Sequence, residues 1–86
     1  MDTFKVSNRV IKTDKFTELP ISTKLLYFYL ISNADEYGQV NDVCNVTKQA
    51  MCSLIDLKIL SLEDYVIFLS DNEVVVADWD VHNSID

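Results

Sequence analysis

The fold is decided by residues 53–78, SLIDLKILSLEDYVIFLSDNEVVVAD. The first half of this stretch carries apolar residues at i, i+4 and i+7, the period of a helix, and two leucines widen the stripe: Ile55, Ile59, Leu62, Leu57 and Leu60. Ser53, followed three residues later by Asp56, resembles a capping pair at a helix entry. We therefore expect a helix over residues 54–64.

The second half of the stretch has the pattern of a β-hairpin. Residues 65–70 and 73–78 are rich in β-branched and aromatic side chains, which favour strands. Asp71 and Asn72 between them suit a tight turn, because both residue types tolerate positive φ. The pattern predicts a hairpin over residues 65–78, with residues 79–86 as a tail.

Upstream, the sequence predicts two more helices and an arm. A helix over residues 21–36 follows Pro20 and is stopped near Gly38, and its apolar residues extend nearly all round: Ile21, Leu25, Leu26, Phe28, Tyr29, Leu30 and Ile31. Residues 39–41 predict a very short strand, and residues 43–50 a second helix behind an Asn41-Asp42 cap. Residues 1–15 are expected to form an extended arm that ends in a short turn at Thr13-Asp14-Lys15-Phe16 and holds four of the seven bases, Lys5, Arg9, Lys12 and Lys15.

This order of elements predicts an α+β winged helix-turn-helix: three main helices and a C-terminal β-hairpin as the wing. Eighty-six residues fit one domain, so residues 1–86 are expected to be a single winged-helix domain. In DNA-binding proteins of this class the third helix usually lies in the major groove.

The charge does not favour that default role. Fourteen acids against seven bases give a net charge of −7, whereas binding to a nucleic-acid backbone relies on Lys and Arg. Acidity that merely maintains solubility is the alternative explanation. The chain has no apolar run of the roughly 20 residues that a membrane span needs, and its start lacks a signal-peptide pattern. We expect a cytoplasmic protein that does not bind membranes.

No enzyme, cofactor or metal site is predicted. Cys44, Cys52 and His82 are too few and too widely spaced for a structural zinc site, which wants four ligands. The sequence has no glycine-rich phosphate loop, and its carboxylates show no pattern that singles out an acid/base pair. We therefore expect a non-enzymatic protein without a cofactor.

Several segments together resemble a known family. They are Thr13-Asp14-Lys15-Phe16, Leu19-Pro20-Ile21-Ser22-Thr23, Leu26-Tyr27-Phe28, Ala34-Asp35-Glu36-Tyr37-Gly38-Gln39-Val40-Asn41, Asp56-Leu57-Lys58 and Asp78-Trp79-Asp80-Val81-His82-Asn83. In this order they resemble the N-terminal domain of phage replisome-organiser (replication-initiation) proteins. The resemblance implies a winged helix of phage or prophage origin, ancestrally a DNA-binding module, at work in a bacterial host cell during infection or lysogeny.

The sequence departs from that family in its charges. Members commonly carry bases in the last turn of the third helix and around the Trp. Here Glu63 and Asp64 end the third helix, and Asp78 and Asp80 flank Trp79. If the last strand continues, the two aspartates share one face while Trp79 points away. A core position is the favoured expectation for Trp79.

Two functions follow from these observations. The first is an acidic interaction protein that occupies a basic nucleic-acid-binding surface of a host protein, for example a CRISPR nuclease effector. Its candidate contacts are acidic: Asp56, Glu63, Asp64, Asp71, Glu73, Asp78 and Asp80. Tyr37, Tyr65 or Trp79 would supply buried anchors. Structural alternatives are a helix cap for Asp56 and protection of a sheet edge by the wing acids.

The second function is a DNA-binding domain for phage replication initiation, whose partner is duplex DNA. Its candidate contacts are basic or amide side chains: Lys5, Arg9, Lys12, Lys48, Gln49 and Lys58. A homodimer would double this patch. Ordinary solvated surface is the alternative for each of these residues.

Overall fold

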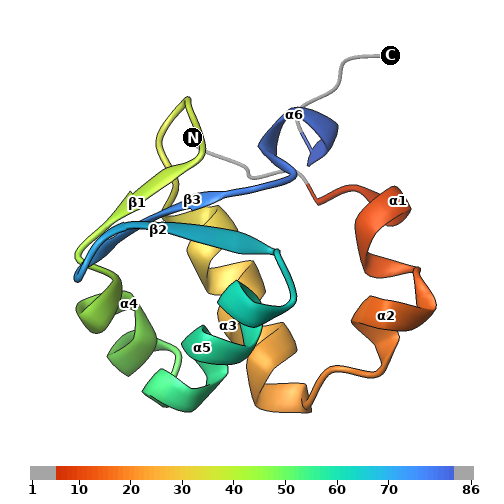
Figure 1. Cartoon of the computed structure of the whole chain (residues 1–86), viewed down its shortest axis with the longest axis horizontal. Helices are drawn as coiled ribbons and strands as arrows, with labels where there is room; N and C mark the ends of the chain where they lie inside the picture. Colours follow the sequence, from red (N-terminus) through yellow and green to blue (C-terminus); the bar gives the residue numbers. More distant parts are fainter. Residues whose placement is uncertain (1–5, 83–86) are drawn as a thin grey trace.

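The computed structural model describes residues 6–82, which form helices and a small sheet (Figure 1). In chain order the elements are α1 (Asn8–Ile11), α2 (Asp14–Thr17), α3 (Ile21–Ser32), β1 (Gln39–Asn41), α4 (Val43–Gln49), α5 (Leu54–Leu62), β2 (Val66–Ser70), β3 (Glu73–Val76) and α6 (Trp79–His82). The expected α+β class is confirmed: α3, α4 and α5 are the three main helices, and the three-stranded antiparallel sheet ends in the β2–β3 hairpin.

The sheet has the strand order β1-β3-β2, so β3 is central. Val40 pairs with Val74 across β1 and β3, and Ile67 pairs with Val75 across the hairpin. A bulge between Phe68 and Ser70 interrupts the hairpin register near its turn. The hairpin is the one predicted over residues 65–78, with its strands confined to Val66–Ser70 and Glu73–Val76.

The tip of the hairpin is fastened to the start of α4. Asn72 Oδ1 accepts from Cys44 N at 2.9 Å, and Asn72 O accepts from Val43 N at 3.1 Å. The predicted cap residue Asp42 makes no side-chain cap hydrogen bond and has a left-handed backbone. It instead accepts from Asn72 Nδ2 at 3.1 Å. The helix entry is therefore capped from the hairpin turn, a long-range partner that the local sequence does not reveal.

The predicted extended arm is wrong over residues 8–12, whereas the short turn expected at Thr13-Asp14-Lys15-Phe16 is present as α2. Ser7 Oγ accepts from Arg9 N and Thr13 Oγ1 accepts from Phe16 N, and these caps open the short helices α1 and α2. Each helix is a single turn, too short to show a periodic pattern. Residues 1–5, including Lys5, and the tail residues 83–86 lie outside the described residues.

The first main helix is shorter than predicted. It ends at Ser32 rather than at residue 36. The next residue, Asn33, caps this end, because its side-chain amide donates to Tyr29 O at 2.8 Å. Gly38 belongs to the following turn instead, with Gly38 N donating to Asp35 O. Its φ is +83°, and a Cβ there would lie 2.5 Å from Trp79 Cγ. Trp79 packs against the core, as expected.

The core lies between α3, α5 and the sheet. Tyr27, Leu26, Leu30 and Leu60 are among its fully buried side chains. The rings of Phe16 and Tyr27, 5.4 Å apart, extend the core beneath α2. The residues 6–82 contain no helix that is long and apolar enough to cross a membrane.

Candidate partner-binding face

The orientation of α5 is set by a buried carboxylate. Asp56 Oδ1 accepts from Ser22 Oγ at 2.7 Å and from Thr23 Oγ1 at 2.8 Å, both on α3. Asp56 Oδ2 accepts from Ser53 N at 3.2 Å, which completes the predicted capping pair. Burial alone would raise the pKa of Asp56, but these hydrogen bonds outweigh it and hold the pKa below its ordinary value. The alternative role of Asp56 as a helix cap is confirmed, and its contact with a partner stays a prediction.

With Asp56 buried against α3, several apolar side chains of α5 face the solvent. The buried residues of α5 are Asp56, Leu57 and Leu60, so the two leucines that widen the predicted stripe are buried, whereas Ile55 and Leu62 at its centre are not. Leu54, Ile55 and Leu62 are consequently 58%, 68% and 79% exposed. We call these three residues the apolar α5 face. The expectation that Ile55 and Leu62 point into the core is wrong, because Asp56 takes the inward position beside α3.

α3 shows the same departure from its predicted stripe. Ile21 and Leu25 are exposed, whereas Thr23 is fully buried through its hydrogen bond to Asp56. Single exposed apolar side chains are ordinary, but several in one region mark interaction sites. The Ser22–Asp56 hydrogen bond holds the entries of α3 and α5 together. The exposed Ile21 and Ile55, one residue before each partner, therefore belong to neighbouring helix ends.

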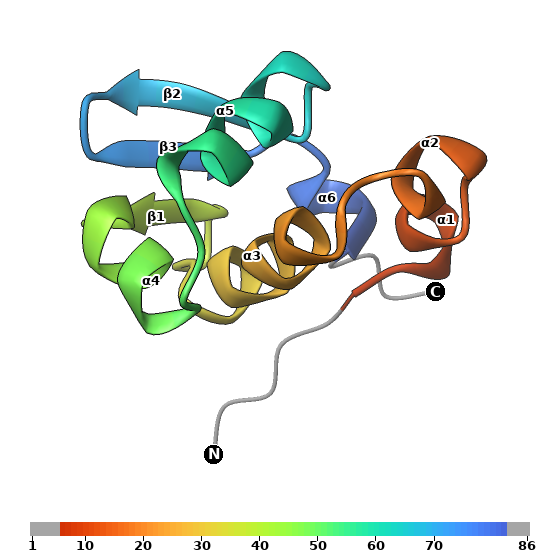
Figure 2. The same cartoon turned by 90° about the horizontal axis from the view of Figure 1, so that it is seen from below.

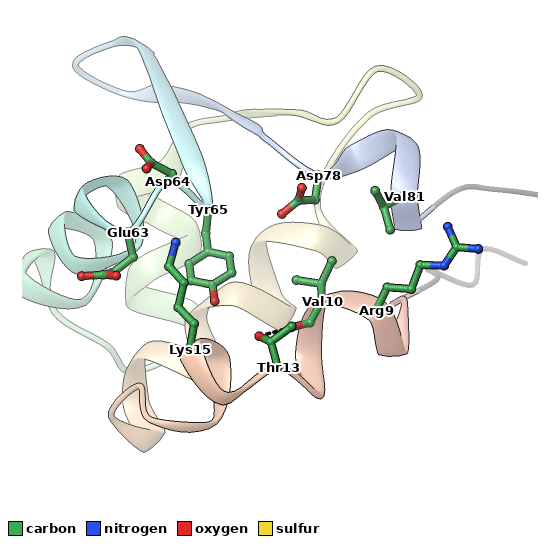
Figure 3. Close-up of a pocket in the computed structure, with 9 residues that line it drawn as sticks. All are labelled: Arg9, Val10, Thr13, Lys15, Glu63, Asp64, Tyr65, Asp78 and Val81. Carbon is green, nitrogen blue, oxygen red and sulfur yellow. Dashed lines mark hydrogen bonds between the residues drawn. The ribbon is translucent and has the colours of Figure 1, made fainter.

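Three predicted acidic residues meet at the far end of α5. Glu63 and Asp64 follow the helix, and Asp78 stands at the start of α6. All three line one hollow of about 350 Å³, together with two bases and four other residues (Figure 3). The full lining is Arg9, Val10, Thr13, Lys15, Glu63, Asp64, Tyr65, Asp78 and Val81. We call it the acidic hollow. The structure thus brings together carboxylates from separate parts of the sequence.

Tyr65 forms a wall of the acidic hollow and is itself buried. Lys15 Nζ lies 5.1 Å from the centre of its ring, in cation–π contact. Burial raises the pKa of the Tyr65 hydroxyl, and the nearby negative charges of Asp78 and Glu63 act in the same direction. Tyr65 is part of the core, whereas Tyr37, the other tyrosine predicted to anchor a partner, is exposed.

The remaining acidic candidates lie elsewhere. Asp71 is exposed in the hairpin turn, and Glu73 Oε1 accepts from Ser70 Oγ at 3.1 Å. Asp78 and Asp80 do not share a strand face, because the backbone turns into α6 at this point. Val81 N and His82 N donate to Asp78 O and close that turn. Asp80 is exposed and does not line the acidic hollow.

The candidate DNA contacts are not gathered into one patch. Lys12, Lys48, Gln49 and Lys58 are exposed, as is Arg9, which lines the acidic hollow on the side away from Glu63 and Asp64 (Figure 3). Figures 1 and 2 place α1 and α4 at opposite sides of the molecule, so Arg9 and Lys48 lie far apart.

A buried histidine links the two ends of the described chain. His82 Nδ1 accepts from Ser7 N at 2.8 Å, and its Nε2 lies 2.6 Å from Tyr27 Oη. Because Nδ1 accepts a hydrogen bond, the neutral ring carries its proton on Nε2 and donates it to Tyr27. Burial lowers the pKa of His82 against the opposing charge of Asp78. The sequence offered no signal for this role, because it predicts only a tail over residues 79–86, whereas His82 lies in α6.

The described residues contain no group of three or more His, Cys, Asp and Glu side chains that could hold a metal ion. Cys44 and Cys52 are free thiols. No protein-family model, curated protein or solved structure matches the chain.

Proposed function

We propose that this chain is a phage-derived winged-helix protein that binds a basic nucleic-acid-binding surface of a host protein and blocks it. The succession of α4, turn and α5 supports a helix-turn-helix, and the β2–β3 hairpin supports a wing. The winged-helix assignment and the phage origin belong to the proposal.

The observation that carries the proposal is the apolar α5 face. A helix that reads DNA presents polar or basic side chains to phosphates and base edges. Leu54, Ile55 and Leu62 make the exposed side of α5 mainly apolar, with Lys58 as its one base, and Glu63 follows the helix. A face of this kind loses contacts with DNA and gains apolar burial against a protein.

Blocking would follow from occupancy alone, without catalysis. Carboxylates of the acidic hollow would steer the chain towards a basic groove that otherwise binds nucleic acid. The apolar α5 face would then supply contact area that phosphates cannot supply. A CRISPR nuclease effector in the host cytoplasm is the concrete partner class, which makes the chain a counter-defence inhibitor of anti-CRISPR type.

The first experiment measures both binding partners directly. The purified chain is titrated into a labelled DNA duplex across a salt series, and separately into a purified CRISPR nuclease effector with its guide and DNA target. We expect inhibition of DNA binding by the effector and no duplex binding by the chain alone. Tight duplex binding that weakens steeply with salt would overturn the proposal.

Two variants separate the apolar and acidic contributions. Ile55→Asp with Leu62→Asp removes apolar contact while adding negative charge, so weaker inhibition reports the apolar contact. Asn8→Asp with Thr17→Asp, at two exposed polar positions outside α5, adds the same charge without removing apolar contact and is the control. Glu63→Lys with Asp64→Asn tests the acidic contribution, and Asn is chosen because Asp64 has φ 66°. Unchanged inhibition in both the apolar and the acidic double variant would contradict the proposed face.

The second candidate is a DNA-binding domain of a replisome organiser. The exposure of Lys48 and Gln49 on α4 and of Lys58 on α5 favours it, because these lie on the two helices of the helix-turn-helix. Lys48→Ala with Lys58→Ala would then weaken duplex binding and reduce its salt dependence. A concentration-dependent homodimer on DNA would support the same alternative.

A further inference from the structure

β2 is an edge strand without the usual protection against pairing. It lies at the margin of the β1-β3-β2 sheet, as Figure 2 shows. Edge strands are commonly guarded by charge, proline or shortness. β1, at the other edge, has only three residues, of which Gln39 and Asn41 are polar. β2 has five residues, Val66-Ile67-Phe68-Leu69-Ser70, with no charge and no proline.

The free edge of β2 has backbone groups available for pairing. Ala77 N donates to Tyr65 O at 3.0 Å, so residues 65 and 77 form a hydrogen-bonded pair. Hydrogen-bonded and non-bonded pairs alternate in an antiparallel ladder, which places Ile67 in the next bonded pair with Val75. The N–H and C=O groups of Val66 and Phe68 therefore point to the free edge.

The side chains around this edge are apolar and exposed. Ile67, Phe68 and Leu69 are 54%, 40% and 52% exposed. Three consecutive exposed residues show that both faces of the strand are open near the hairpin tip, since alternate side chains lie on opposite faces. An added strand could thus pair with the backbone and cover side chains on either face.

The charges at the two ends of β2 decide what such a strand must be. Glu63 and Asp64 precede the strand, and Asp71 and Glu73 follow it. A second copy of β2 would place acid beside acid in either direction, which costs free energy. An extended segment with apolar residues in its centre and Lys or Arg on both flanks meets complementary charge in either direction.

We propose that β2 binds such a basic-flanked apolar segment of the partner protein by strand addition. This inference rests on the proposed function, because it describes how the same basic host protein is held. Backbone hydrogen bonds would supply affinity, while the apolar centre and the basic flanks would supply specificity.

The probe is a synthetic peptide with a Val-Thr-Ile-Thr-Val centre and two lysines at each end, titrated into the full chain. Nuclear magnetic resonance follows the backbone amides, and we expect the largest shifts and slower hydrogen exchange at Val66 and Phe68. The same peptide with N-methyl groups on all five central amides keeps its charge but has no central N–H to donate from either edge. We expect this control to lose at least roughly ten-fold in affinity. Equal binding of both peptides would overturn strand addition.

Matched protein variants test the flanking charges. Glu63→Lys with Asp71→Lys reverses acid at both ends of β2, and we expect roughly ten-fold weaker peptide binding at low salt. Glu18→Lys with Glu36→Lys changes the net charge equally at exposed positions outside β2. Equal loss in both double variants would show attraction by net charge alone and overturn the proposal.

A further variant blocks the edge itself. Phe68→Pro removes an edge-facing N–H, and circular dichroism establishes whether it keeps the fold. If it unfolds, the N-methylated peptide provides the same test without altering the protein. Inhibition of the nuclease effector without peptide binding at β2 would overturn strand addition and leave the proposed function standing. Peptide binding at β2 without any effector inhibition would overturn the proposed function instead.

Discussion

At the scale of single residues, Asp56 has the largest structural effect. Its carboxylate satisfies two hydroxyls of α3 and the entry of α5. Asp56→Ala leaves the Ser22 and Thr23 hydroxyls without that acceptor. We expect the free energy of unfolding to fall by about 2–4 kcal/mol, measured by urea denaturation. Glu36→Ala, an exposed acid, is the control and is expected to change it by less than about 0.5 kcal/mol.

A pH dependence follows from His82. In the unfolded chain the pKa of His82 is about 6.5, and burial keeps the folded-state pKa below that value. The unfolded state therefore binds more protons once the pH falls below about 6.5, and folding stability decreases down to the folded-state pKa. A proton on Nδ1 would also face the Ser7 N–H donor, so acid weakens the contact between the N-terminal segment and α6.

The measurement is urea denaturation between about pH 5 and 7.5, with a slope of at most about 1.4 kcal/mol per pH unit from this group. His82→Gln removes the titrating ring and is expected to flatten the profile above about pH 5. The lowered pKa of Asp56 acts in a separate window, where stability is lost only as the pH falls below about 4. An unchanged profile in His82→Gln would assign the dependence to other groups.

At the scale of elements, the sequence predicted which helices and strands exist better than which way they face. Periodicity located α3, α5 and the hairpin, because their patterns are long enough to be distinctive, whereas α4 was predicted from an Asn41-Asp42 cap. It centred the buried stripe of α5 on Ile55 and Leu62, which are exposed, because apolar residues occupy both sides of that helix and a buried Asp56 decides between them. No local sequence pattern predicts a buried carboxylate whose hydrogen-bond donors are hydroxyls more than thirty residues away.

The candidate site was predicted in the same uneven way. Glu63, Asp64 and Asp78 were singled out by charge and do line one hollow. Their convergence with Arg9 and Lys15 depends on tertiary packing of α1 and α2, which short capped turns do not reveal. The apolar α5 face was hidden because an exposed leucine and a core leucine look identical in a sequence.

The junction between hairpin and α4 gives a prediction at this scale. Asn72→Ala removes the acceptor for Cys44 N, and we expect a loss of about 1 kcal/mol in the free energy of unfolding. Amide hydrogen exchange at Cys44 would become faster than in the parent protein. Asn45→Ala, at an exposed position within α4, is the control. Equal exchange at Cys44 in both variants would contradict capping by Asn72.

At the scale of the whole molecule, the net charge of −7 bears on the stability of the fold. Seven excess negative charges repel one another in a small domain, and salt screens that repulsion. We expect the melting temperature to rise between about 10 and 200 mM NaCl. Glu18→Lys with Glu36→Lys reduces the net charge and is expected to lessen the rise. A melting temperature that falls with salt would mean that specific attractive charge contacts outweigh the repulsion.

The contact between Asn72 and α4 also bears on the order of folding. α4 has seven residues, well below the about 12–15 at which an isolated helix becomes even marginally stable. Its first amides find their acceptors on a turn that lies 28 positions further along the chain. We therefore expect α4 to form after the hairpin has closed, and mutations in α4 to speed unfolding more than they slow refolding.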